Sequence, residues 1–403
     1  MLRAALIPVA LLSLSAAHAE DPDWLREART REGKLVAPHE LRSDDGWLSA
    51  RVPVKVRDVA KLEKSYVVAL DVGSTRPAYC EFIPGGFHFA DTLRQKVDST
   101  LKELEPIQGK VEGREIEFTD AGSFGEAPYL KASWLYRVND GKQARLGALK
   151  QMVFEKLGHA VYCSHLDIGY VKTFDAATRA LAESFDAPAA TAPAYFREIS
   201  VASLAGSRIG ISVTTLVHEK DGNTRARQVS AVVIRSASGD VTTQDSVHVE
   251  RIHPDGALID ALDETNSNGE VSSSMALTRD QARWIVEGEM QGKKVRANLP
   301  ADAQPHSWIE QSRELRKLLA GDQPVGAVHS IPMWISLDPG NVTDMKTTVL
   351  EMKSPNAFTA RASAGPLEYQ ELLDKGTGLP TLSDIPMGPQ TLRVERVHLS
   401  GSF

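Results

Sequence analysis

The sequence has 403 residues, of which 42% are hydrophobic and 25% are charged, and its formal net charge is −7 at pH 7. These proportions are typical of a soluble globular protein. The mildly acidic balance disfavours general binding to nucleic acid or to anionic membranes, which attract basic surfaces. Beyond the first 19 residues, no apolar run approaches the roughly 18 residues that a transmembrane helix needs.

The first 20 residues have the pattern of a secretory signal peptide. Arg3 supplies a positive charge, residues 4–14 form a short apolar run, and Ala17, His18 and Ala19 form an A-x-A cleavage site. The apolar run is too short to remain in a membrane as a span. We therefore predict a signal peptide at 1–19, cleavage after Ala19, and a periplasmic protein.

Two cysteines, Cys80 and Cys163, are the only ones in the chain. An even number of cysteines in an exported protein predicts a disulfide between them. Such a bridge would stabilise the fold by roughly 4–5 kcal/mol on the chain-entropy model. The alternative is a pair of separate buried thiols that behave as small apolar side chains.

Composition divides the chain after the signal peptide into four segments. A charged lead-in that contains two prolines covers 20–43, and a proline- and alanine-rich linker covers 187–194. Between the lead-in and the linker lies an N-terminal domain at 44–186, and after the linker lies a C-terminal domain at 195–403.

Periodicity predicts strands and two helices in the N-terminal domain. Apolar residues at every second position indicate strands, and the repeat of Leu93, Val97, Leu101 and Leu104 indicates a helix. In chain order we expect strands at 47–56, 65–71 and 78–83, a helix at 90–104, strands at 114–118, 130–138 and 161–172, and a helix at 174–185. This order of elements resembles the PsbP/Mog1-type sandwich of small exported bacterial domains, which implies an α/β sandwich.

The C-terminal domain is expected to be mainly strands. Turn signals every 10–15 residues separate the strand-like segments, which is typical of an antiparallel meander. We expect strands at 210–218, 228–235, 241–251, 271–277, 282–289 and 293–299, a helix at 306–320 that ends at Gly321, and strands at 333–337, 347–352, 358–361, 368–374 and 391–399.

Several short glycine and proline motifs in this half carry a second resemblance. They are Ser207–Gly210, Gln291–Val295, Leu299–Asp302, Leu373–Gly378 and Pro386–Leu392. Their succession resembles the curved antiparallel-sheet domain of exported bacterial proteins, often found ahead of a transglutaminase-like domain. Similar half-barrel sheets occur in lipoprotein carriers, which implies a sheet able to hold something apolar. The predicted fold class is α+β with two domains: an N-terminal α/β sandwich and a C-terminal, mainly antiparallel curved β-sheet with a short helix.

The sequence offers one cluster with catalytic character, Cys163 and His165. On a strand these two side chains point to the same face, where a Cys–His pair supports a nucleophile or a metal. The structural alternative is a bridged or buried Cys163 and a His165 that satisfies a local hydrogen bond. The motifs of α/β-hydrolases, phosphate-binding loops, dinucleotide-binding folds and zinc helices are absent from the sequence.

Three tryptophans of the C-terminal half, Trp284, Trp308 and Trp334, are the candidate ligand-binding residues, with core packing as the alternative. The polar stretch that contains Asp260, Asp263 and Glu264 is interpreted as a solvated loop, because it lacks the spacing of a calcium loop.

We therefore expect a non-enzymatic periplasmic binding or accessory factor that takes an apolar ligand, a lipid or a polypeptide. No cofactor, no metal and no nucleic acid partner is expected. One alternative is an envelope-processing enzyme, or a subunit of one, that uses Cys163 and His165. Another is a structural adaptor that docks onto an envelope complex.

Overall fold

The computed structural model of the chain describes residues 22–403 except 64, 85–87, 142, 236–239 and 282. The predicted signal peptide and its cleavage site therefore lie outside the described residues. Within the described ranges, no helix is both long enough and apolar enough to cross a membrane.

The described chain divides into two compact units. One contains residues 22–193 together with Ala231–Thr243, and the other contains Ala194–Ser230 and Gln244–Phe403. The domain limits predicted from composition, including the linker at 187–194, stay a prediction.

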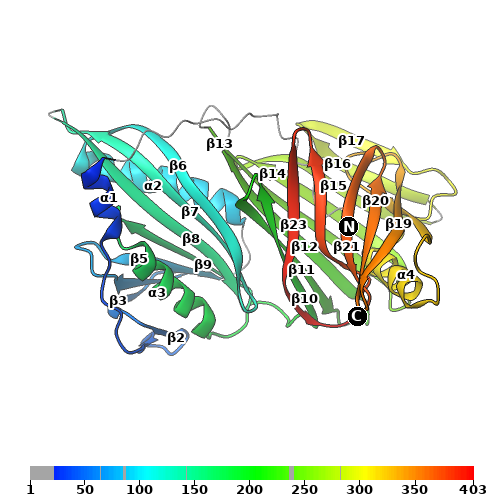
Figure 1. The fold of residues 1–403 in the computed structure, drawn as a ribbon, viewed down its shortest axis with the longest axis horizontal. Coiled ribbons are helices and arrows are strands. Elements are labelled where there is room, and N and C mark those ends of the chain that lie inside the picture. The colour runs from blue at the N-terminus through cyan, green and yellow to red at the C-terminus, as the bar shows by residue number, and fades with distance from the viewer. Residues whose placement is uncertain (1–21, 64, 85–87, 142, 236–239, 282) are drawn as a thin grey trace. The chain divides into compact units, whose positions relative to one another are not determined.

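The N-terminal unit is built on a seven-stranded antiparallel sheet with the order β3-β4-β5-β9-β8-β7-β6 (Figure 1). Its strands are β3 (Lys55–Lys61), β4 (Tyr66–Asp71), β5 (Ala78–Pro84), β6 (Lys110–Phe124), β7 (Ala127–Asn139), β8 (Ala144–Lys156) and β9 (His159–Leu166). A separate hairpin of β1 (His39–Arg42) and β2 (Ser49–Val52) adds Leu41, Ala50 and Val52 to the same core.

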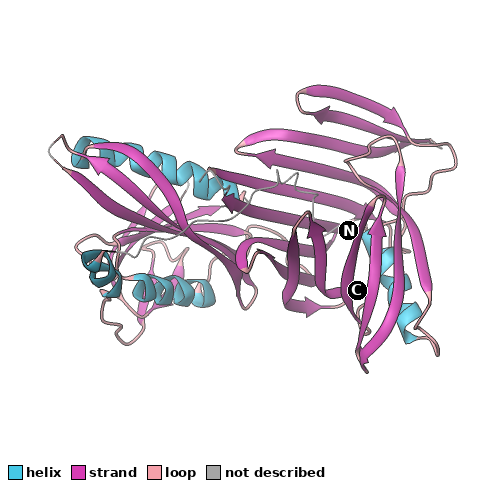
Figure 2. Ribbon diagram, turned by 45° about the horizontal axis from the view of Figure 1, so that its top comes forward, coloured by secondary structure: helices cyan, strands magenta, loops and turns pink. Residues whose placement is uncertain are grey.

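Helices cover both faces of this sheet (Figure 2). Helix α2 (Phe89–Gln108) packs against β6, β7 and β8, and α3 (Val171–Ser184) packs against β8 and the hairpin strand β2. The short α1 (Asp23–Thr30) precedes them in the chain. Because both faces are covered, the first eight residues of β7 are all buried.

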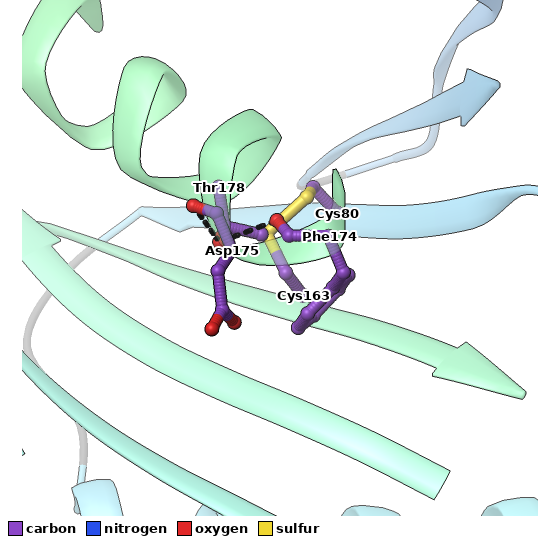
Figure 3. Close-up of a disulfide and its surroundings, with 5 residues drawn as sticks. All are labelled: Cys80, Cys163, Phe174, Asp175 and Thr178. Atoms are coloured by element: carbon purple, nitrogen blue, oxygen red, sulfur yellow. Dashed lines mark hydrogen bonds between the residues drawn. A yellow bond between two sulfur atoms is a disulfide. The ribbon is translucent and has the colours of Figure 1, made fainter. Parts of the chain in front are cut away.

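The predicted disulfide is present between β5 and β9. Cys80 and Cys163 lie directly opposite each other on these antiparallel strands, with their Cα atoms 4.0 Å apart. Figure 3 shows the bridge beside Phe174, Asp175 and Thr178 of α3. Both cysteines are fully buried in the core of the unit.

A 14-stranded antiparallel sheet made of two meanders belongs mainly to the C-terminal unit. The first meander runs through β10 (Phe196–Leu204), β11 (Ser207–His218), β12 (Thr224–Arg235), β13 (Val241–Ile252), β14 (Leu258–Ser267), β15 (Glu270–Asp280), β16 (Arg283–Met290) and β17 (Lys293–Asn298). The second runs through β18 (Val328–Trp334), β19 (Val342–Ser354), β20 (Ala357–Ala364), β21 (Leu367–Asp374), β22 (Pro380–Met387) and β23 (Gln390–Gly401).

The two meanders are joined by β10 and β23, the strands of this sheet that come first and last in the amino-acid sequence. Strand β10 pairs antiparallel with β23 in the middle of the sheet, so that β17 and β18 form its edges. Helix α4 (Trp308–Ala320) connects these edge strands in the chain and packs against β18. Its first turn is capped by Ser307, whose side-chain oxygen accepts a hydrogen bond from the backbone N–H of Glu310.

The predicted fold class, α+β with an N-terminal α/β sandwich, is wrong. The described chain is mostly antiparallel β-sheet and contains four helices, and the 14-stranded sheet dominates it. Strand β8 was missed because burial on both faces removes the alternation by which strands are recognised. The interpretation of 260–264 as a solvated loop is also wrong, since these residues lie within β14.

Candidate functional site

The candidate site is a cavity of about 330 Å³ that is lined entirely by residues of the C-terminal unit. This volume lies at the lower end of the range for small-molecule sites. One wall is polar and comes from strands β12 to β15. The other wall is largely apolar and comes from β16, β18, β19 and the residues that follow β18.

Strand alternation produces the polar wall. Gln244, Ser246, His248 and Glu250 are every second residue of β13, so their side chains share one face of the sheet. The register places Ser246 opposite Thr265 and His248 opposite Asp263 on β14. All six of these residues line the cavity, and Val247 and Val249, which alternate with those of β13, do not.

At the centre of this wall, His248 lies between two carboxylates. Its Nδ1 is 3.2 Å from Oδ2 of Asp263, and its Nε2 is 3.2 Å from Oε1 of Glu250. Both nitrogens must carry a hydrogen to make these bonds, which requires the imidazolium form. Burial opposes the charge on the ring, but the hydrogen bonds to Asp263 and Glu250 outweigh burial and raise the pKa of His248 to about 9.

Both carboxylates also bind groups outside the ring. The second oxygen of Glu250 accepts the backbone N–H of Trp308, the first residue of α4, at 3.0 Å. Oδ1 of Asp263 accepts the hydroxyl hydrogen of Ser336 at 2.9 Å. The network therefore ties β13 and β14 to the start of α4 and to the segment after β18.

This arrangement suits binding better than acid–base catalysis. In a Ser–His–Asp triad the histidine keeps one nitrogen free to accept the serine proton. Here Ser336 donates to Asp263, and both nitrogens of His248 are occupied by carboxylates. The histidine has no nitrogen available as a base, and the serine is not activated as a nucleophile.

Further hydroxyls and amides extend the polar wall. Ser272 Oγ donates to the backbone oxygen of Thr265 at 2.9 Å, and the side chain of Gln228 donates to Ser212 Oγ at 3.0 Å. The buried Oγ of Ser273 has no hydrogen-bond partner in the described structure and belongs to the cavity lining. A ligand with hydrogen-bonding groups would find partners along this wall.

The opposite wall is apolar and adaptable. Its side chains are Met290, Met333, Trp334, Ile335, Leu337 and Met345. Methionines are flexible and polarisable, so they fit ligands of irregular shape. The cavity is thus amphipathic, because hydrogen-bonding groups and apolar side chains both line it.

The three predicted tryptophans do not lie together around this cavity. Trp334 is in its wall, while Trp284 packs with Val286 and Leu299 in a neighbouring apolar cluster that also contains Trp334. Trp308 is buried in a different cluster, where its ring contacts Phe196 and Phe403. A role for any of them in ligand binding stays a prediction.

The other predicted pair, Cys163 and His165, lies in the N-terminal unit. Cys163 is held in the disulfide, so it presents no thiolate in this state. His165 is 1% exposed and packs near the rings of Tyr170 and Phe174. Burial and the nearby Lys150 lower the pKa of His165 to about 4, which keeps the ring neutral.

Lys150 itself is buried beside this histidine. Its ammonium group donates to the backbone oxygens of Asp167 and, at 2.7 Å, Gly169, in the turn that leads into α3. Burial lowers the pKa of Lys150 to about 8. The ammonium group of Lys150 therefore stabilises the turn that precedes α3.

In the described part of the chain, no set of three or more His, Cys, Asp or Glu side chains is placed to hold a metal ion.

Sequence reasoning missed the residues that define the cavity. His248 lay in a segment correctly predicted as a strand, and the signal was present in the polar side chains at every second position of 244–250. This pattern was not interpreted as a binding site because the polar face of a strand is usually expected to point to water. Asp263 was missed because its surroundings were assigned to a loop.

Comparisons with known proteins assign no family to the chain. No protein-family model matches it, and no curated protein matches it. Among solved structures, the chain is similar to a crystal structure described as a β-barrel-like protein of a domain of unknown function, DUF1849, from Brucella abortus. That protein is 12% identical with a TM-score of 0.39, and the match covers 52% of this chain and 98% of the other. Neither the PsbP/Mog1-type nor the transglutaminase-associated resemblance is shown, and the identity of the chain rests on its own residues.

Proposed function

We propose that the chain is an exported binding protein whose C-terminal unit holds a small amphipathic molecule in the cavity around His248. The observation that carries this proposal is that one cavity is lined both by hydrogen-bonding side chains and by methionines and other apolar side chains. Small-molecule sites commonly combine an apolar lining with a few polar groups that orient the ligand. This proposal narrows the expected apolar ligand, lipid or polypeptide to a molecule with one polar and one apolar part.

Export to the periplasm is part of the proposal. It is supported by the signal-peptide pattern of the first 19 residues and by the Cys80–Cys163 disulfide, which is stable in oxidising compartments. The test is fractionation of cells that express the full chain, followed by N-terminal sequencing. A mature protein that begins at Glu20 in the periplasmic fraction is the expected result, and a full-length cytoplasmic chain would contradict it.

Binding is tested with N-phenyl-1-naphthylamine, a neutral dye whose fluorescence rises when it leaves water. We expect saturable binding to the wild-type protein. Ser246→Phe places a ring in the cavity from the middle of β13, and we expect it to weaken dye binding by roughly 10–100-fold, the cost of losing the burial of an apolar group. Native mass spectrometry of the protein purified from cells checks for a natural ligand in parallel.

The matched control is Ser363→Phe. Ser363 lies on β20 and is not part of the cavity lining, so the same substitution there should leave dye binding unchanged. Circular dichroism of both variants shows whether the sheet is intact. Unchanged dye binding by a folded Ser246→Phe variant, or no dye binding by the wild-type protein, would contradict the proposal.

The enzymatic alternative with Cys163 and His165 has less support, because the disulfide removes the thiol and burial keeps His165 from solvent.

A further inference from the structure

We infer that the cavity prefers molecules whose polar part is a positively charged ammonium group, attached to an apolar body. This inference rests on the proposed binding function and adds the charge class of the ligand. The inferred preference depends on two properties of the cavity: the net charge of its lining residues and the hydrogen-bond acceptor sites on Asp263 that no group of the described residues occupies.

The charged groups in the cavity wall sum to a negative value. Among the described residues that line the cavity, Asp263 and Glu250 are the carboxylates, His248 is the one group that can be positive, and there is no lysine or arginine. With His248 protonated the wall carries one net negative charge, and with His248 neutral it carries two. The sign of the net charge is therefore the same in either state of the histidine, and partial shielding from water strengthens its effect on a ligand.

An anionic ligand would find no partner for its charge. The positive charge of His248 is already directed at Asp263 and Glu250 through both ring nitrogens. A carboxylate or phosphate in the cavity would lose its hydration without a cationic side chain to replace it, which is costly. This excludes fatty acids and acidic lipid headgroups as preferred ligands.

An ammonium group, in contrast, would find free acceptors. A carboxylate can accept about four hydrogen bonds, and the hydrogen bonds from His248 and Ser336 occupy one site on each oxygen of Asp263. The side chain of Asp263 is 21% exposed, whereas that of Glu250 is 4% exposed, so Asp263 is the accessible carboxylate. Ser273, with its unpartnered Oγ, adds a further hydroxyl to the same wall.

The apolar wall then accommodates the body of the ligand. Met290, Met333 and Met345 offer polarisable surface, and the indole of Trp334 lies in the same wall. Methionine sulfur and aromatic faces tolerate an alkyl chain or a ring next to a cationic centre. A primary amine with an apolar body therefore satisfies both walls at once.

The test uses three probes with the same hydrocarbon body and different heads: octylamine, 1-octanol and octanoate. Their ability to displace N-phenyl-1-naphthylamine from the full-length mature protein is measured at pH 7. We expect octylamine to bind at least ~10-fold more tightly than 1-octanol, the scale of a charge-assisted hydrogen bond, and octanoate to bind most weakly. Octanol or octanoate binding as tightly as octylamine would overturn the inference.

Asp263→Asn removes the accessible charge while keeping a side chain of the same shape. We expect this variant to lose about 10-fold in octylamine affinity and to keep its octanol affinity. Asp260→Asn is the matched control on the same strand, because Asp260 pairs with Arg251 at 2.8 Å and does not line the cavity. If Asp263→Asn does not fold, the three probes on the wild-type protein still decide the inference.

The outcomes separate this inference from the proposed function. If the dye binds the wild-type protein and octylamine has no advantage over its neutral and anionic analogues, the charge preference is wrong and the binding function stands. If the dye itself does not bind, the proposed function fails and the inference fails with it.

Discussion

Each unit of the protein has a histidine on a strand next to a cavity, and the two histidines are held in opposite charge states. His165 on β9 lies among aromatic rings beside Lys150, and its pKa is lowered to about 4 by burial and by that neighbouring charge. His248 on β13 is partly buried, and two carboxylates raise its pKa to about 9. The comparison shows that the partners of a buried histidine, more than its burial, decide whether it carries a charge.

The surroundings of the two histidines differ in the same way. His165 lies beside the rings of Tyr170 and Phe174 and lines a cavity of about 280 Å³, whereas His248 lies between two carboxylates in the polar wall of the cavity of about 330 Å³. A neutral histidine beside aromatic rings contributes to packing, whereas a polar network in a cavity wall can bind a ligand. Four experiments test this contrast, and hydrogen exchange measured by mass spectrometry reads the stability of each unit separately.

The largest effect is expected from the double substitution Cys80→Ala and Cys163→Ala. Removing a bridge between residues that are 83 positions apart restores chain entropy to the unfolded state and should cost about 4–5 kcal/mol. Hydrogen exchange should rise throughout the N-terminal unit and stay unchanged around His248. Equal destabilisation of both units would show that they do not act separately.

Next comes Glu250→Leu in the C-terminal unit. The substitution leaves His248 with one carboxylate and the backbone N–H of Trp308 without its acceptor. Removing one partner of a buried ion pair should destabilise the unit by about 3–5 kcal/mol. Urea unfolding followed by fluorescence measures the change, and Glu395→Leu, at an exposed position of β23, is the control that should have little effect.

Acid should then destabilise the N-terminal unit through His165. The folded-state pKa, about 4, lies below the ordinary value of 6.5, so the unfolded chain binds the proton more readily. Stability is retained above pH 6.5 and is lost as pH falls towards 4, by about 3 kcal/mol in total. His165→Phe should remove this dependence, whereas His39→Phe, at an exposed position of β1, should keep it. A slope that survives in His165→Phe would assign it to other groups.

The smallest effect is expected in alkali, in the C-terminal unit. The folded-state pKa of His248, about 9, lies above the ordinary 6.5, so its stabilising contribution is complete below pH 6.5 and disappears as pH rises through 9. Because the ring is 18% exposed, we expect a loss of about 2 kcal/mol, less than full burial would give. His248→Gln should flatten the alkaline limb of the stability curve. The exposed His253 offers the matched control His253→Gln, which should leave that limb unchanged.

The sequence predicted local elements better than the fold that they build. Helix α2 follows from the spacing of Leu93, Val97, Leu101 and Leu104, all of which are buried in the structure. Strands β10 and β22 were not predicted, and neither was the pairing of β10 with β23. Pairing between distant segments has no periodic signal in a single sequence, so the size of the large sheet was not accessible.

For the candidate site, the sequence predicted one lining residue, Trp334, as a ligand-binding residue, but it did not predict the charged centre formed by His248, Glu250 and Asp263. The polar face of β13 points into a cavity instead of water, so the rule that assigns polar residues to the outside gave the wrong direction. The side chains of His248 and Asp263 meet only because β13 and β14 pair in one register. Register depends on the whole hairpin and cannot be read from either strand alone.

The pairing of β10 with β23 has a consequence for how the large sheet assembles. Each meander contains only neighbouring hairpins, which form quickly because their strands are close in the chain. The pairing between them brings Phe196 opposite Gly401, which are far apart in the amino-acid sequence. Because the chain between these residues is long, we expect this pairing to form later than the hairpins. In this pairing a Cβ on Gly401 would meet the backbone oxygen of Tyr195 at 1.9 Å, and its φ of +77° also favours glycine. A defect in the last few residues would therefore divide the sheet through its middle, leaving two meanders with exposed inner edges that are prone to aggregate.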